Sequence, residues 1–297
     1  MDPQSLRHDM EKMMGKLGRL AQDKNLSIED LNELLVGRTL DEIDSEMGDL
    51  ILSDQEKAKD MVYQALDESN PALRKTIIDN AIALYPHLPN AWLIKAEDEA
   101  LSPEQALEYL ERAVIAGEKD LVKNFFQENE GHFWGLIETR PYMRAKAALA
   151  DLLWQLERED EAISHYQDCL RLNHNDNQGI RDVLLNCLLV KNDLDGAEKL
   201  LKRYKDDFGA SHAFNKALFL FKKHGPESKR AGTQMEKSIS LNGFVPQYLL
   251  GKRKLPQHLP NTYAFKSKEE AIIYAEGAMR AWKETPGAIR WLAVFFF

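Results

Sequence analysis

Three side chains between residues 132 and 140 combine an acid, a base and a cation beside aromatic residues. His132, Glu138 and Arg140 flank the pair Phe133 and Trp134. If these side chains converged, Glu138 could act as a general base while Arg140 held an anionic substrate. The alternative is structural: Glu138 pairs with Arg140, and the aromatic rings fill the core. We favour the structural interpretation, because ion pairs that only stabilise a fold occupy similar places.

A second candidate is a metal site. His165 and Cys169 are four residues apart, so they would share one face of a helix. Two ligands do not complete a tetrahedral site, and a thiol at a small inward position usually serves as a small hydrophobe. We therefore expect no metal. Cys169 and Cys187 are also too few for a disulfide framework and fit a reducing compartment, so we expect a cytoplasmic protein.

Common catalytic and cofactor motifs are missing from the sequence. It contains no P-loop, GxGxxG, GxSxG, HExxH, EF-hand loop or CxxC pair. Their absence argues against several common enzyme classes but not against all enzymes, and we expect a non-enzymatic protein without a cofactor.

The charge is distributed unevenly along the 297 residues. Residues 1–140 contain 29 acidic and 15 basic side chains, whereas residues 141–297 contain 19 and 24. The second half is too weakly basic to predict a nucleic-acid partner. No run of about 18 uncharged apolar residues predicts a membrane span. The acidic first half would suit a chaperone for secreted proteins, which is an alternative function.

The elements that must position these residues are helices with a regular repeat. A small Ala is followed four residues later by a large apolar residue at Ala162, Ala197 and Ala231. Intervals of 35 and 34 residues are typical of a helix-turn-helix array. The core positions expected in the best unit are Leu149, Ala150, Leu153, Ala162, Tyr166 and Leu170.

We expect one continuous array with atypical ends. At the N-terminus, Ser27 and Asp30 predict a capping box for a helix ending near Gly37, and a further helix begins near Thr39. An amphipathic stripe on the first helix contains Leu6, Met10, Met13, Leu17 and Leu20. The expected segments are a helical cap (1–54), degenerate repeats (55–115), an insertion (116–141), repeats (142–242), and a proline-interrupted segment with C-terminal helices (243–297).

Residues 143–176 resemble a tetratricopeptide repeat, whose two helices meet through small residues at these positions. The resemblance continues over 178–209 and 212–242, and it implies an all-α fold, a right-handed α-solenoid of helix-turn-helix repeats. The first helices of such a solenoid line a concave groove that holds a peptide or a partner helix. We therefore expect an interaction scaffold or adaptor with a protein or peptide partner. The expected partner-binding residues are Arg140, Arg144, Asp151, Asp182, Asn186 and Lys216.

Some tetratricopeptide domains hold a C-terminal carboxylate in a clamp of Lys, Asn and Arg side chains. Only Asn186 and Lys216 match that pattern in this sequence. The resemblance therefore does not predict a chaperone-tail binder.

The C-terminal segment carries a second resemblance. The string GFVPQYLLGKRKLPQHLP, followed by EEAIIYAEGAMRAWKETPGA, is similar to the tail of the suppression-of-tumorigenicity-seven family. Uncharacterised bacterial tetratricopeptide proteins resemble this tail as well, and they share the run ETRPYMR at residues 138–144. The first family has membrane-spanning segments that this sequence lacks, so a membrane role is not implied. Neither resemblance implies a biochemical activity.

The sequence ends in the apolar string WLAVFFF. An exposed apolar cluster of this kind marks a docking surface. Our first interpretation is packing against the preceding helix, and the second is self-association through Phe295, Phe296 and Phe297.

Overall fold

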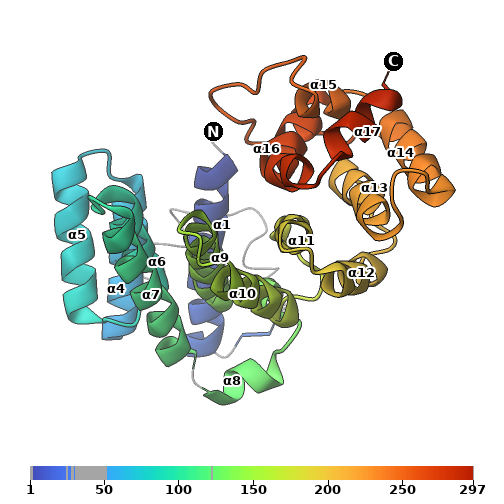
Figure 1. The fold of residues 1–297 in the computed structure, drawn as a ribbon. Helices are drawn as coiled ribbons and strands as arrows, with labels where there is room; N and C mark the ends of the chain where they lie inside the picture. The colour runs from blue at the N-terminus through green and yellow to red at the C-terminus, as the bar shows by residue number, and fades with distance from the viewer. Residues whose placement is uncertain (1–2, 25, 28–29, 31–51, 122, 297) are drawn as a thin grey trace. The chain divides into compact units, whose positions relative to one another are not determined.

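The computed structural model describes residues 3–24, 26–27, 30, 52–121 and 123–296. Within these ranges every regular element is a helix, apart from an isolated bridge between His132 and Asn173, so the predicted all-α class is confirmed. The chain forms two compact units, Met1–Asn177 (unit 1) and Gln178–Phe297 (unit 2). Each unit is built from helices that pack against their neighbours along the chain (Figure 1).

The described part of unit 1 contains three helix pairs. They are α4 (Asp54–Asp67) with α5 (Pro71–Leu84), α6 (Pro89–Asp98) with α7 (Pro103–Asp120), and α9 (Arg140–Gln155) with α10 (Glu159–Leu172). Consecutive pairs meet through α5 with α6 and through α7 with α9. Helix α1 (Pro3–Lys24) precedes the pairs, and α8 (Lys123–Glu128), η1 (Phe133–Gly135) and η2 (Ile137–Thr139) separate the second pair from the third.

Local signals fix where these helices begin. Ser53, Asn70 and Ser102 precede α4, α5 and α7, and each side chain accepts a hydrogen bond from a backbone amide of the first turn. Glu56 completes a capping box at the start of α4. A proline opens α5, α6 and α7, where the missing amide hydrogen would have no helical partner in any case.

Unit 2 contains two further pairs and three C-terminal helices. The pairs are α11 (Ile180–Val190) with α12 (Leu194–Arg203) and α13 (Ala210–His224) with α14 (Lys229–Leu241). The remaining helices are α15 (Val245–Leu249), α16 (Lys268–Glu284) and α17 (Ala288–Val294). Helix α16 packs against α11, α13 and α15 (Figure 1). Because α11 and α13 are the first helices of their pairs, α16 covers the first-helix face of unit 2.

The core positions predicted from the repeat period are confirmed. Ala162, Ala197 and Ala231 have no exposed surface, so the helices of each pair approach closely at these points. The other predicted core residues, all buried, are Tyr166, Leu201 and Met235, with Leu149, Ala150, Leu153 and Leu170. The period therefore identified the residues at which these helices pack.

An aromatic cluster fixes the segment Gly117–Arg140, which interrupts the period. Phe133 is fully buried, and its ring centroid lies 5.1 Å from that of Phe126 and 6.3 Å from that of Tyr142. A Cβ atom on Gly117 would lie 2.6 Å from the ring of Tyr142, so the absence of a side chain lets α7 approach α9. The prediction that the aromatic rings fill the core is confirmed for Phe133, whereas Trp134 is only half-buried.

The described part of the N-terminal cap contains α1 and the start of the next predicted helix. The backbone amide of Ser27 donates to Asp30 Oδ2 at 2.8 Å, and the amide of Asp30 donates to Ser27 Oγ at 3.1 Å. These reciprocal bonds confirm the predicted capping box. The helix predicted through Gly37 and the one from Thr39 lie outside the described residues.

The C-terminal WLAVFFF string packs in part against unit 2. Trp291 is buried, and its ring centroid lies 5.3 Å from that of Phe295. Lys252 Nζ lies 4.7 Å from the ring centroid of Phe296. These contacts support packing against preceding elements. Phe297 lies outside the described residues, and self-association through this string stays a prediction.

Candidate partner-binding face

Side chains of helix α1 contact the first helices of two of the described pairs of unit 1. Arg19 of α1 forms an ion pair with Asp60 of α4 at 3.2 Å. Glu11 of α1 accepts two hydrogen bonds from Arg144 of α9, at 2.9 and 3.0 Å, and Arg144 also donates to Asn90 of α6 at 3.3 Å. α1 is therefore joined directly to α4 and α9, and through Arg144 to α6. We call the surface that α4, α6 and α9 present to α1 the first-helix face of unit 1.

Glu11 is the centre of this contact. Its side chain is only 4% exposed, and a second guanidinium, that of Arg140, lies 3.6 Å away. A buried carboxylate costs free energy unless cations and hydrogen bonds compensate it, and the two arginines supply that compensation. The structure thus brings together two of the predicted partner-binding residues, Arg140 and Arg144, on one acidic side chain.

The predicted pairing of Arg140 with Glu138 is wrong. Arg140 faces Glu11 instead, donates from Nε to the backbone oxygen of Trp134 at 3.0 Å, and stacks over the Trp134 ring at 5.7 Å. Glu138 is exposed and points into the cavity described below. The reason is that α1 places the buried carboxylate of Glu11 beside Arg140. Charges that are shielded from water attract each other more strongly, so Arg140 pairs with Glu11 rather than with the exposed Glu138.

The predicted stripe on α1 is wrong at Met10, and the side chain of Leu6 lies outside the described residues. Leu17 and Leu20 are buried as expected, but Met10 is 54% exposed and its neighbour Glu11 is buried. The packed face is therefore rotated toward Glu11, because the ion pairs with α9 lie on that side. Sequence reasoning missed Glu11 since its partners are more than 120 residues away.

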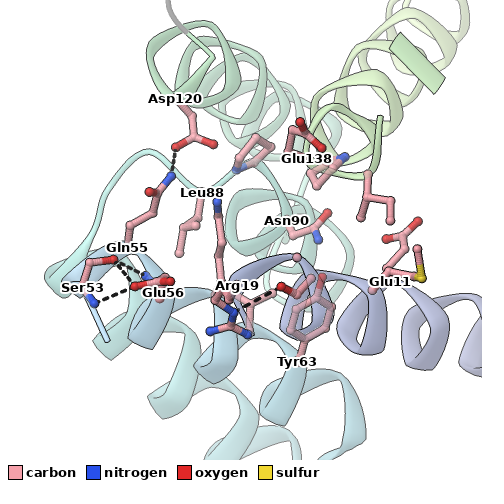
Figure 2. A pocket seen from close by; sticks show the side chains of 18 residues that line it. Glu11, Arg19, Ser53, Gln55, Glu56, Tyr63, Leu88, Asn90, Asp120 and Glu138 are labelled. Atoms are coloured by element: carbon pink, nitrogen blue, oxygen red, sulfur yellow. Dashed lines mark hydrogen bonds between the residues drawn. The ribbon is translucent and has the colours of Figure 1, made fainter. Parts of the chain in front are cut away.

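A cavity lies between α1 and parts of α4, α6, α7 and η2 (Figure 2). Its volume is about 590 Å³. Glu11, Met14, Gly15, Gly18 and Arg19 of α1 form one wall. The opposite walls contain Val62 and Tyr63 of α4, Leu88, Pro89 and Asn90 at the start of α6, Asp120 at the end of α7, and Ile137, Glu138 and Pro141 near η2. Both apolar and polar side chains therefore reach the cavity.

The electrostatics of the cavity favour binding rather than proton transfer. Burial, together with the nearby charge of Glu11, raises the pKa of Tyr63, so its phenol stays protonated and can donate a hydrogen bond. Hydrogen bonds from Ser53 lower the pKa of Glu56, so this carboxylate stays charged. Asp120 already accepts hydrogen bonds from Gln55 at 2.6 Å and from the Tyr85 hydroxyl at 2.7 Å.

The three residues considered for catalysis do not form a constellation. His132 and Glu138 are exposed, and Arg140 is engaged by Glu11 and Trp134. Glu138 lines the cavity, whereas neither His132 nor Arg140 does. A general base and an anion-holding cation must face one substrate position, and this arrangement does not provide one.

Asp151, a further predicted site residue, lies on α9 two turns beyond Arg144 and hence on the same side of the helix. Its Oδ1 accepts a hydrogen bond from the Tyr166 hydroxyl of α10 at 2.5 Å. Asp151 does not line the cavity. The contact joins the two helices of its pair, and although the residue as a whole is exposed, burial of the carboxyl group raises the pKa of Asp151.

Asn186, one of the predicted site residues of unit 2, lies on the face that α16 covers. Asn186 of α11 accepts a hydrogen bond from the side-chain amide of Asn215 of α13 at 2.8 Å. The hydroxyl of Tyr274 on α16 donates to Asn215 Oδ1 at 2.9 Å. Asp182 and Lys216, on α11 and α13, are half-buried. Asn186 is therefore engaged inside unit 2.

Sequence reasoning also missed the packing of α16 on this face. A signal was present, because small residues recur along one side of the helix. The fully buried members are Ala271, Ala275, Ala278 and Ala281. Small side chains at such spacing let two helices approach closely.

The residues considered for a metal site have other contacts. His165 Nδ1 lies 3.3 Å from Nζ of Lys146, which also pairs with Asp168 at 2.8 Å. Burial raises the pKa of the Cys169 thiol to about 12, so this side chain remains a neutral, buried thiol. Among the described residues, no group of three His, Cys, Asp or Glu side chains is arranged to hold a metal ion.

Comparisons with known proteins give distant relatives. No protein-family model matches the chain. The chain is 24% identical over 264 residues to a Drosophila melanogaster protein named "Protein ST7 homolog", which covers 78% of this chain and 47% of that protein. It is 26% identical over 272 residues to a Gallus gallus "Suppressor of tumorigenicity 7 protein-like", with 81% and 47% covered, and 25% identical over 298 residues to the Danio rerio protein of the same name, with 91% and 47% covered.

The chain thus spans about half the length of the curated relatives it matches. The names of these relatives support the resemblance that the C-terminal segment predicts. Within the described ranges no helix combines the length and the apolar character needed to cross a bilayer.

Proposed function

We propose that this protein is a non-enzymatic adaptor that binds a helix or an extended peptide of a partner protein. In this proposal the helix pairs of each unit are tetratricopeptide-like repeats of a right-handed α-solenoid, and the partner lies on the first-helix face of unit 1. The pairing of consecutive helices and the buried Ala162, Ala197 and Ala231 support the repeat assignment.

One observation carries the proposal: the first-helix face of unit 1 already holds a helix. Helix α1 binds there through Glu11 with Arg140 and Arg144 and through Arg19 with Asp60. A surface that accommodates an amphipathic helix of its own chain has the shape and the charge to accommodate one from another protein. The equivalent face of unit 2 is covered by α16, which leaves unit 1 as the binding unit.

A cytoplasmic location is part of the same proposal. Cys169 and Cys187 are both buried free thiols. Thiols that remain reduced fit a cytosolic environment. The partner is expected to be a protein, because the exposed charges near the cavity include acids such as Glu138 that would repel a nucleic acid.

The test is quantitative affinity purification of the full chain from its source cells. Arg144→Glu removes the guanidinium that holds Glu11 and would repel an acidic partner. We expect the partner to be lost from this variant while the circular dichroism spectrum stays helical. Partners retained at the wild-type level would place the interface elsewhere.

The matched control is Arg112→Glu in unit 1. Arg112 lies on α7, the second helix of its pair, and its side chain is 51% exposed. The charge change is identical to that of Arg144→Glu, but the site is outside the first-helix face. We expect Arg112→Glu to retain the partner. Loss of the partner from this variant would show that net charge, not the first-helix face, controls capture.

A further inference from the structure

The first-helix face of unit 1 is only partly filled by α1. Gly15 and Gly18 of α1 both line the cavity of about 590 Å³, and a Cβ atom built on either residue meets no atom within 4 Å. Residues at i and i+3 lie on the same side of a helix. α1 therefore turns two residues without side chains toward a space that is large enough for apolar side chains.

The cavity has walls suited to apolar side chains. Val62 of α4, Leu88 and Pro89 at the start of α6, and Ile137 and Pro141 near η2 line it opposite the two glycines. Val62 and Leu88 are nearly fully buried. Apolar side chains placed against them would gain the free energy of leaving water, which α1 does not gain at Gly15 and Gly18.

A position for a carboxylate lies beside the cavity, where Glu11 meets two arginines. Arg140 and Arg144 approach from α9, and Asn90 holds Arg144 in place from α6. In the structure this position is filled by Glu11, which lies one helical turn before Gly15. A carboxylate between two guanidinium groups would fix the register and the direction of any helix on this face.

Helix α1 is poorly suited to stay bound permanently. Glycine inside a helix is unfavourable relative to alanine, and α1 has two. Its ion pairs come from Glu11 and Arg19, and although Leu17 and Leu20 are buried, Met10 and Met14 stay exposed. By contrast, α16 of unit 2 buries Tyr274, Trp282 and a row of alanines and has the features of a permanent structural helix.

We propose that α1 is an exchangeable occupant, and that the face takes an amphipathic partner helix with a carboxylate followed by large apolar residues four and seven positions later. The carboxylate would replace Glu11 between Arg140 and Arg144, and the apolar side chains would enter the cavity beside Gly15 and Gly18. The inference rests on the proposed function and specifies the sequence pattern that this face selects. It also makes α1 a competitor, so the partner binds more weakly than it would to an open face.

The test uses a labelled peptide and the full chain. The probe is a fluorescein-labelled peptide of residues 3–24 that carries Gly15→Leu and Gly18→Leu, and fluorescence anisotropy reports its binding. We expect this peptide to bind at least about tenfold more tightly than the unsubstituted peptide, because two leucine side chains are buried. Adding Glu11→Gln to the peptide should weaken its binding at least about tenfold through loss of the charged hydrogen bonds.

Substitutions in α1 of the full chain should change the affinity for the leucine peptide in opposite directions. Glu11→Gln in the chain weakens the competitor and leaves both arginines available, so the leucine peptide should bind more tightly than to the wild type. Gly15→Leu with Gly18→Leu in the chain strengthens the competitor and should reduce peptide binding. Gly15→Ala with Gly18→Ala is the matched control, since it raises helix propensity without filling the cavity, and its effect should be smaller.

Hydrogen exchange of the full chain reports the exchange of α1 directly. We expect the amides of α1 to exchange faster than those of α16, and the double leucine variant to slow the exchange of α1 alone. Amides of α1 that are as protected as those of α16, or equal affinity of the leucine and glycine peptides, would overturn the inference. If partner capture still required Arg144 in that case, the proposed function would stand and only the exchange of α1 would fail.

Discussion

The carboxylate of Glu270 accepts a hydrogen bond from the backbone amide of Ala210, sixty residues earlier in the chain, at 2.8 Å. Glu270 is buried near the start of α16, and Ala210 is the first residue of α13. The same carboxylate accepts from the side-chain amide of Asn242 at 2.9 Å and from the backbone amide of Lys266 at 2.6 Å. One acidic side chain thus joins the start of α13, the end of α14 and the loop before α16.

Replacing Glu270 with Gln should destabilise unit 2. A glutamine side chain has only one accepting oxygen, and its NH₂ group would face a buried N–H donor that then loses its partner. We expect the free energy of unfolding to fall by about 2–3 kcal/mol, as measured by urea denaturation. Glu269→Gln is the control, because Glu269 is exposed in the same helical turn. An equal loss in both variants would show that the buried contacts of Glu270 contribute nothing.

Short-range spacing accounts for what the sequence predicted correctly. Ala162 and Tyr166 are four residues apart, so their burial follows from helix geometry and the repeat period. Ser27 and Asp30 form their capping box for the same reason, since both partners belong to one turn. Such features need no knowledge of the rest of the fold.

The candidate site could not be predicted in this way, because its key contact joins distant residues. Glu11 and Arg144 are separated by 133 positions, and no local pattern indicates that an acid at position 11 is buried. The same limit explains the wrong pairing of Arg140 with Glu138, since the neighbouring acid was visible in the sequence and the distant one was not. The repeat resemblance nevertheless predicts Arg140 and Arg144 as binding residues.

Replacing Tyr274 with Phe should break a buried chain of hydrogen bonds in unit 2. The Tyr274 hydroxyl accepts from Nε1 of Trp282 at 2.8 Å and donates to Asn215. Its removal leaves a buried donor and a buried acceptor unpaired, so we expect the free energy of unfolding to fall by about 2 kcal/mol. Urea denaturation followed by tryptophan fluorescence measures the change.

The matched control for this prediction is Tyr263→Phe. Tyr263 is 49% exposed in the loop before α16, where water can replace any lost contact of its hydroxyl. We expect a change within about 0.5 kcal/mol. If Tyr274→Phe were as mild as Tyr263→Phe, the hydroxyl of Tyr274 would not hold α16 on the first-helix face of unit 2.

The stability of unit 1 should fall as the pH drops below the ordinary pKa of histidine. Burial lowers the pKa of His165 below its usual 6.5, and the positive charge of Lys146 lowers it further. The unfolded chain therefore binds a proton at His165 more readily than the folded chain, and acid favours unfolding from about pH 6.5 down to the lowered pKa. Above about pH 6.5 His165 is neutral in both the folded and the unfolded chain, so its titration no longer changes the free energy of unfolding.

The size of this effect is modest and can be isolated by substitution. His165 is half-buried, so solvent screening limits the loss to about 0.5 kcal/mol. Urea denaturation of the wild type at about pH 7.5 and pH 5.5 should show a decrease that His165→Gln reduces. His132→Gln changes an exposed ring in the same unit and should leave the decrease intact. A pH dependence that is identical in His165→Gln and the wild type would mean that His165 titrates alike in the folded and unfolded states.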